Sequence, residues 1–316
     1  QEVIKEVSLK DTERFFGSYA QNMVSRNKGN ARAIIMFHSH AVEKGLTHTD
    51  FRPGFGKISI PKLARELNNW MAAGKSTEDT FFQIGVSVMR SYFERHKSIG
   101  FDVSEFRDQF SAPVQELIEQ TDESQGGVLA AELTREIRIE SDQDRNFLDV
   151  AFSRRSVREF TRAPVADEDI QRAVQVAVQA PSVCNRQPAR VHQFDDPRTI
   201  RAAVKLQGGF GGYEIPPKLL LVTCDLEAFL FAVERNQAYI DGGLFMMGLL
   251  LGLENVGLGA CSLNTAMSIE REGALRKLLN IPESEVFISF IAVGHFDPSV
   301  MVCRSKRMPL DEVLEH

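Results

Sequence analysis

The spacing of hydrophobic positions changes near residue 145. Before that point apolar residues recur at intervals of three and four, which predicts a mostly helical region. Beyond it, helical patterns alternate with short apolar runs typical of strands. We therefore expect two domains, a helical N-terminal region over 1–145 and a mixed region over 146–316.

In the first region, helices are expected over 9–26, 31–46, 62–73, 80–98 and 128–140. Ser76 or Thr77 is the expected N-cap of the helix at 80–98. In the second region, strands are expected over 190–194, 218–224, 258–263 and 286–294. The helix expected over 227–253 is apolar nearly all round, which is typical of burial on several sides, as at a dimer core. Strands alternating with helices indicate an α+β or an α/β sandwich.

A run of cations opens the second region. Residues 153–158 read SRRSVR, three arginines and two serines in six positions. Planar guanidinium groups beside hydroxyls suit a phosphate and the polar edge of a ring. Such a run is also typical of a solvated surface, so by itself it is weak evidence.

A polar loop follows about two dozen residues later, after the amphipathic helix pattern at 170–178. It reads APSVCNRQP over 180–188, and prolines stiffen it at both ends. Loops held by rigid elements are where binding residues concentrate, which strengthens the case for a site.

Together these motifs resemble the nitroreductase-like FMN flavoprotein family. The strings RRSVREF and APSVCNRQP look like its opening, and GLGACSLN at 257–264, VGH at 293–295 and RSKRMPL at 304–310 fall where its later motifs stand. The resemblance covers about residues 146–316. It implies an α+β fold, a mixed sheet flanked by helices, in an intertwined homodimer with FMN at the interface.

The resemblance also implies roles for individual residues. Arg154 and Ser156 would bind the phosphate and ribityl chain, with Arg155 beside them. Arg158 would face the flavin N1/O2 edge and favour the reduced anion. No side chain is required as a catalytic acid or base. The expected cofactor-binding residues are Arg154, Arg155, Ser156, Arg158, Pro181, Ser182, Val183, Asn185, Gln207, Ser262, Leu263, Asn264, Thr265, Arg304, Lys306 and Arg307.

The expected activity is a two-electron reduction of a small organic acceptor, such as a nitro compound or a quinone, driven by NADH or NADPH in a ping-pong route. Two departures near the ring leave alternatives open. Ala189 stands where the family often has an aromatic residue, and the run from Ser262 to Asn264 lacks the family's Trp or Glu. The alternatives are a flavin dehydrogenase or oxidase acting on a biosynthetic intermediate, and a non-catalytic flavin-fold protein that binds a partner.

Composition excludes some classes. The net charge of −6, from 43 acidic against 37 basic residues, argues against general nucleic-acid binding. No apolar run approaches the length of a membrane span, and the chain opens without a signal pattern, so we expect a cytoplasmic protein. Four cysteines without a CxxC pair indicate reduced thiols, of which Cys184 lies in the polar loop.

The histidine-rich stretch FHSHAVEKGLTHTD at 37–50 invites a metal interpretation. His40 and Glu43 share a helix face, but His38 and His40 point apart. Since metal sites need several converging ligands, a polar helix end or contact surface is favoured and no metal is expected. For the helical region we expect either a lid over the flavin, with the loop 51–55 as its closing element, or a surface for a partner.

Overall fold

The computed structural model describes residues 28–136 and 146–314, with isolated positions near the N-terminus. It has two compact units. The mixed unit is Ala131–Val300, and the helical unit is Ile4–Ala130 with Met301–His316. Most of the helix expected over 9–26 lies outside the described residues.

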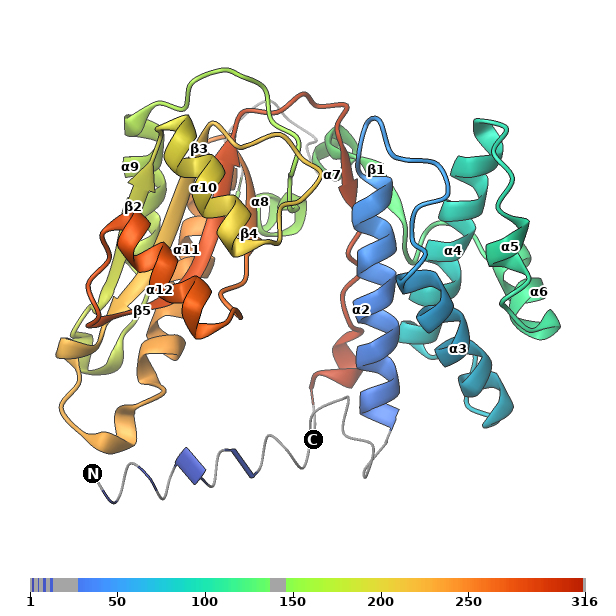
Figure 1. Ribbon diagram of the computed structural model, residues 1–316, viewed down its shortest axis with the longest axis horizontal. Helices are drawn as coiled ribbons and strands as arrows, with labels where there is room; N and C mark the ends of the chain where they lie inside the picture. Colours follow the sequence, from blue (N-terminus) through green and yellow to red (C-terminus); the bar gives the residue numbers. More distant parts are fainter. Residues whose placement is uncertain are drawn as a thin grey trace. The chain divides into compact units, whose positions relative to one another are not determined.

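The helical unit is built on helices that pack around one aromatic and aliphatic core (Figure 1). Trp70, Phe82 and Tyr92 are among its largest fully buried side chains. The helices are α2 (Lys28–Leu46), α3 (Ser59–Ala72), α4 (Thr80–Ser98), α5 (Ser104–Arg107) and α6 (Ala112–Gln120). A 3-10 turn, η4 (Leu310–Glu312), also belongs to this unit.

The N-cap expected for α4 is wrong. Asp79 takes that position, and its carboxylate accepts the backbone N–H of Phe81 at 3.1 Å. The same carboxylate binds the Arg32 guanidinium of α2 at 2.5 Å. Asp79 is therefore held by a tertiary contact that Ser76 and Thr77 do not share, which local propensity cannot reveal.

A short antiparallel sheet joins the two distant ends of the helical unit. Strand β1 (Val128–Ala130) pairs with β6 (Met301–Cys303). The expected helix over 128–140 is therefore wrong at its start: it begins as a strand, and α7 (Ala131–Glu136) follows. Its remaining residues lie outside the described part. The hydrogen-bond partner that makes 128–130 a strand comes from the other end of the chain.

The same pairing changes the domain boundaries. Residues 301–316 pack with the helical unit, whereas 146–316 was expected to form one domain. Residues 131–136 belong to the mixed unit. The physical reason is the strand pairing of Met301–Cys303, a contact between segments too far apart in sequence for a composition change to mark it.

The mixed unit contains a four-stranded sheet in the order β2-β3-β5-β4, with all neighbouring strands antiparallel. The strands are β2 (Ala189–Phe194), β3 (Lys218–Asp225), β4 (Gly259–Leu263) and β5 (Glu285–Gly294). All four lie close to the expected positions. A parallel bridge from Ser156 to Ala260 makes the pairing mixed. The predicted α+β class is confirmed.

Helices cover both faces of this sheet (Figure 1). Leu220 and Val222 of β3 face α9 (Asp167–Ala177) and α11 (Gln237–Asn255), while Leu219 and Leu221 face α10 (Pro197–Gln207) and α12 (Ile269–Leu279). Helix α8 (Phe147–Ser153) precedes the arginine run. Because side chains alternate along a strand, an uninterrupted apolar run is what a strand covered on both faces requires.

Helix α11 begins later than expected. Residues 226–236 form the 3-10 turns η2 (Leu226–Ala228) and η3 (Ala232–Glu234) instead of helix. The Glu234 carboxylate accepts the backbone N–H groups of Leu230 and Phe231 and also pairs with Arg186. These bonds hold the segment in a loop, against the helical pattern of its sequence. None of the described helices is both long and apolar enough to cross a membrane.

Candidate functional site

The arginine run lies along the edge of the sheet. Helix α8 ends at Ser153, whose hydroxyl donates to Glu254 of α11 at 3.0 Å. Arg154 then adopts an extended conformation. Two residues later, Ser156 bridges to Ala260 of β4, and the N–H of Val157 donates to the Ala260 carbonyl at 3.0 Å. The run is therefore held beside β4 by a single parallel bridge and a backbone hydrogen bond.

Glycine allows this close approach. A Cβ at Gly259 would lie 3.0 Å from Cβ of Val157 and 2.7 Å from the Phe296 ring. Gly259 pairs with Gly294 of β5, where a Cβ would lie 2.9 Å from the Phe160 ring. The distances to the Phe296 and Phe160 rings are shorter than real contacts show, and the distance to Val157 is tighter than most, so these neighbours fit as they stand only over glycine.

The three guanidinium groups of the run differ in their surroundings. Arg158 is buried, with 8% of its surface exposed, and its Nη1 lies 3.4 Å from the Ser156 carbonyl. Arg155 donates through Nη1 to the carbonyls of Phe152 and Arg154. Arg154 is half-buried. Guanidinium groups at the sheet edge form a fixed cationic surface next to β4.

The end of β4 supplies polar groups beside this surface. Ser262 and Asn264 are exposed, whereas the side chain of Leu263 is in the core, so Leu263 can offer only its backbone. Gln207, at the end of α10, donates through Nε2 to the Asn264 carbonyl at 2.9 Å. The hydroxyl of Thr265 donates to the Phe287 carbonyl at 3.3 Å. The structure thus brings Gln207 and Asn264 into contact, and their expected contacts with a flavin stay a prediction.

The polar loop at 180–188 has strained backbone. Cys184, Asn185 and Gln187 have φ of 48°, 54° and 51°, the left-handed region that favours glycine. Strain of this kind persists only where surroundings impose it, and it clusters at functional sites. Here the Ser182 hydroxyl accepts the N–H of Gln187 at 2.9 Å, and Asp241 accepts the N–H of Val183 at 3.2 Å.

A cavity of about 230 Å³ opens beside this loop. Its lining includes Pro181, Ser182, Gln187, Arg190, Asp241 and Phe245. None of the arginines of the 153–158 run is among its lining residues. The cavity beside the loop and the arginine run are therefore separate features of the mixed unit. Helix α11 lines the cavity through Asp241 and Phe245.

Two features of this site were missed from the sequence. Asp241 is 3% exposed and is held by Gln237 at 2.8 Å, so a buried carboxylate supports the loop. An acid inside an otherwise apolar helix was the signal that could have revealed it. The second feature is the Arg186–Glu234 ion pair, in which hydrogen bonds from the Arg186 guanidinium lower the pKa of Glu234 to about 2.

The C-terminal cations lie in the other unit. Arg304 follows β6, and its backbone N–H donates to the Gly127 carbonyl at 3.1 Å. Lys306 and Arg307 are exposed, and Arg307 donates to the Ser305 carbonyl at 2.6 Å. Their expected contact with a flavin phosphate stays a prediction.

Comparison with known proteins gives the class of the mixed unit. The family model "Nitroreductase family" matches residues 151–216, which hold the arginine run and the polar loop. A Thermus thermophilus "NADH dehydrogenase" is 28% identical over 195 residues, 52% of this chain and 92% of its own length. A Bacillus subtilis "FMN reductase [NAD(P)H]" is 24% identical over 174 residues, 50% of this chain and 68% of its own length. The resemblance to the nitroreductase-like family is confirmed.

Among solved structures, a Desulfovibrio desulfuricans protein in complex with FMN aligns with a TM-score of 0.45 at 28% identity. The alignment covers 55% of this chain and 98% of that protein. The family match covers residues 151–216 and so lies within the mixed unit. The helical unit, Ile4–Ala130 with Met301–His316, lies outside the match.

Proposed function

We propose that the mixed unit binds FMN and catalyses an NAD(P)H-dependent reduction of a small organic acceptor. The observation that carries this proposal is the bridge between Ser156 and Ala260, which sets the arginine run beside 262–265. These are the segments that the motifs assign to the two ends of a flavin. The chain is thus an FMN-dependent oxidoreductase of the nitroreductase type.

The donor set fits the cofactor. Its phosphate needs cations and hydroxyls, which Arg154 and Ser156 supply. Its pyrimidine edge needs hydrogen-bond donors and a positive charge, which Gln207 and Arg158 supply. Its N5 and O4 need backbone donors, which the turn after Leu263 supplies. When bound, the flavin supplies the two-electron chemistry, and the chain's residues bind and orient it.

The burial of Arg158 matters for its role. A guanidinium that is 8% exposed is little screened by water, so its charge acts strongly on a neighbouring ring edge. Arg158 would hold negative charge at that edge without transferring a proton, since arginine stays protonated. The hydride transfers themselves need no acid–base side chain, because hydride moves from the nicotinamide to the flavin and then from the flavin to the acceptor.

We also propose that the active form is a homodimer with FMN at the interface. Tyr239, Ile240, Leu244 and Met247 of α11 are 45–55% exposed, so one apolar face of the helix is not buried within one chain. Exposed apolar faces of this kind mark association sites. The same helix supports the polar loop through Asp241, so a partner packed on α11 would bring its own polar loop towards this flavin.

The test is the absorbance spectrum of the purified chain with NADH and with NADPH under anaerobic conditions. A flavin spectrum bleached by either nucleotide, and restored by a quinone or nitroaromatic compound, is expected. A flavin that responds to neither nucleotide would indicate a dehydrogenase or oxidase of another substrate. A chain that binds no flavin would contradict the proposal and leave a binding protein on a nitroreductase scaffold.

For the helical unit, the two expected roles stay predictions: the loop 51–55 as a lid element, or a surface that binds a partner. Phe51 and Phe55 pack inside their own unit, with rings 5.1 Å from those of His96 and Tyr92 respectively. The exposed residues of this loop, Arg52 and Pro53, are therefore the ones that could restrict a substrate.

An Arg52→Ala/Pro53→Ala double variant should reduce bulky quinones faster than the natural chain while reducing small ones at the same rate. Lys97→Ala/Asp102→Ala, at exposed positions elsewhere in the helical unit, is the matched control. Equal ratios of bulky to small rates in all three proteins would exclude the loop as a lid element.

A further inference from the structure

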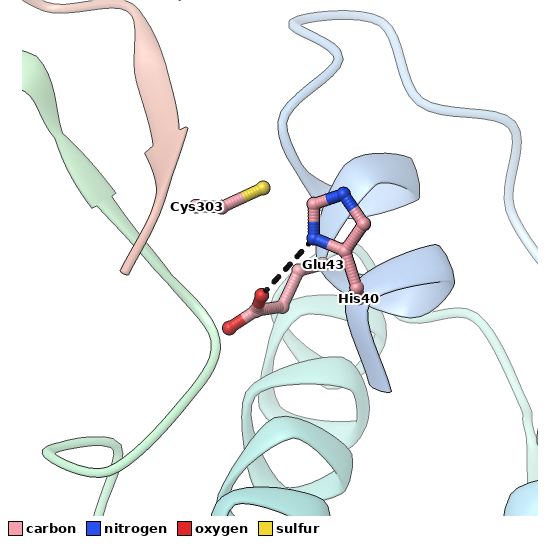
Figure 2. Close-up of side chains that lie close together, drawn as sticks. All are labelled: His40, Glu43 and Cys303. Atoms are coloured by element: carbon pink, nitrogen blue, oxygen red, sulfur yellow. Dashed lines mark ion pairs between the residues drawn. The ribbon is translucent and has the colours of Figure 1, made fainter. Parts of the chain in front are cut away.

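His40, Glu43 and Cys303 meet at one point of the helical unit. One ligand atom from each lies within 4.8 Å of the other two (Figure 2). His40 and Glu43 lie one turn apart on α2, and Cys303 ends β6. The three side chains offer a ring nitrogen, a carboxylate oxygen and a sulfur, which are the ligand types that zinc accepts.

The carboxylate of Glu43 is already oriented. Its Oε1 accepts the backbone N–H of Gly127 at 3.1 Å, and its Oε2 lies 3.8 Å from Nδ1 of His40. The first bond is the kind of outer contact that fixes a metal ligand, and it leaves the second oxygen directed towards the cluster. Gly127 has φ of 96°, and a Cβ there would lie 2.6 Å from the Ser91 hydroxyl, so this loop position requires glycine.

The same loop positions the sulfur. The Gly127 carbonyl accepts the N–H of Arg304 at 3.1 Å, and Val128 pairs with Cys303 in the sheet. One short segment thus orients Glu43 through its N–H and fixes the residue beside Cys303 through its carbonyl. The cluster is built on a helix and a paired strand, which are rigid supports for a metal site.

Burial favours a cation at this point. Glu43 is 4% exposed and Cys303 is 2% exposed. A buried carboxylate needs a compensating charge or several hydrogen bonds, and a cation between it and the sulfur would supply that charge. The His40 side chain is 47% exposed, so one side of the cluster is open to solvent.

We propose that His40, Glu43 and Cys303 bind a divalent metal ion of the zinc class, with water in a fourth position on the exposed side. Metal–ligand distances of about 2.0–2.3 Å place tetrahedral ligand atoms roughly 3.3–3.8 Å apart. The His40–Glu43 separation of 3.8 Å is a few tenths of an ångström longer than a nitrogen and an oxygen ligand require, and rotation of the exposed His40 ring can shorten the distances from its nitrogen to the other two ligands. A mixed nitrogen, oxygen and sulfur set favours zinc over magnesium or calcium, which prefer oxygen alone.

Metal binding would have a structural consequence. The ion would link α2 to β6 and so fasten the C-terminal segment to the rest of the helical unit. Binding would displace the Cys303 thiol proton to solvent, because the thiolate is the ligand. The sequence analysis expected no metal because it considered only residues 37–50, and the third ligand lies at the other end of the chain.

The test uses the full chain, freed of metal with a chelator and titrated with zinc against a chromophoric competitor. One zinc per chain is expected. Cobalt(II) in place of zinc should give a thiolate charge-transfer absorption. Glu43→Gln keeps the acceptor for Gly127, and Cys303→Ser and His40→Gln remove one ligand each. Each variant should weaken zinc binding at least about tenfold. Losing only an outer contact to a metal ligand already weakens binding by about that factor, and these variants change a ligand itself.

Matched controls are Cys184→Ser and His295→Gln, which remove the same chemical groups from the mixed unit. They should bind zinc as the natural chain does. Binding well below one zinc per chain, or equal affinity in the natural chain and Cys303→Ser, would overturn the proposal. So would an equal loss in the controls. If Cys303→Ser fails to fold, His40→Gln still decides, since its half-exposed side chain tolerates replacement.

Discussion

Ser156 and Ala260 form a parallel bridge between segments about a hundred residues apart in the sequence. One carries the arginine run, and the other leads into the exposed groups at the end of β4. The bridge brings the two motifs together on one surface. The sequence alone had related them only by their order along the chain. The first two predictions depend on it.

Replacing Arg154 by alanine should weaken FMN binding at least tenfold. The variant loses a charge-assisted contact to phosphate worth about 1.5–3 kcal/mol. Flavin titration followed by fluorescence measures the change. Arg162→Ala is the matched control, because the Arg162 side chain is 93% exposed and lies outside the run. If Arg154→Ala binds FMN as tightly as this control, Arg154 does not bind the phosphate.

Replacing Gly259 by alanine should both destabilise the mixed unit and weaken FMN binding. The new methyl would meet Val157 and Phe296 at 3.0 and 2.7 Å, so the Phe296 ring must move and the segment that carries the arginines must give by a few tenths of an ångström. Overpacking of this kind lowers the free energy of unfolding by about 1–3 kcal/mol.

The control for this change is Gly273→Ala in α12, where the new methyl would meet no described atom within 4 Å apart from its chain neighbours and its own helix backbone. It should raise the free energy of unfolding by about 0.5–1 kcal/mol, as replacing a helical glycine does. Urea unfolding gives both values. A Gly259→Ala variant that is unfolded no more easily than the natural chain would contradict the close packing of 157–160.

Inserting a charge at Leu244 should weaken the dimer and release FMN together. Leu244→Asp places a carboxylate on the exposed apolar face of α11, where association would bury it without a partner. Light scattering and retained flavin absorbance are measured on the same sample. Ile269→Asp, at an 87% exposed position of α12, should change neither. A monomeric Leu244→Asp variant that keeps FMN would separate assembly from the flavin site.

The Arg186–Glu234 pair should make stability depend on pH in the acid range. The pKa of Glu234 is lowered to about 2 from an ordinary value of 4.5, chiefly by hydrogen bonds from Arg186. The native state thus favours the charged carboxylate. The stability it contributes is complete above pH 4.5 and is lost as the pH falls through about 2.

Thermal unfolding of Glu234→Gln measures this effect. The Tm of the variant should lie below that of the natural chain at neutral pH, and the gap should close as the pH falls towards about 2. In an Arg186→Ala background, the same substitution should show a much smaller gap, because the donor is absent. A gap that stays constant with pH would show that the carboxylate charge does not hold this loop.

The sequence by itself determined the elements whose signal is local. The strand at 218–224 was found because an unbroken apolar run suits a strand covered on both faces, and β3 has that position. Helix 80–98 was found at the same limits as α4. The resemblance to the family was also found from the sequence, because each of its motifs is a short string of residues within one loop or strand.

Tertiary structure decided what depends on distant partners. Val128–Ala130 is a strand only because Met301–Cys303 pairs with it, and residues 226–236 leave the helical pattern because Glu234 is bound by Arg186. The same pairing assigns the C-terminal segment to the helical unit and brings Cys303 to His40 and Glu43. Such contacts join residues that are far apart in the sequence, so no local pattern encodes them. At these positions the hydrogen-bond and charge partners outweigh local propensity.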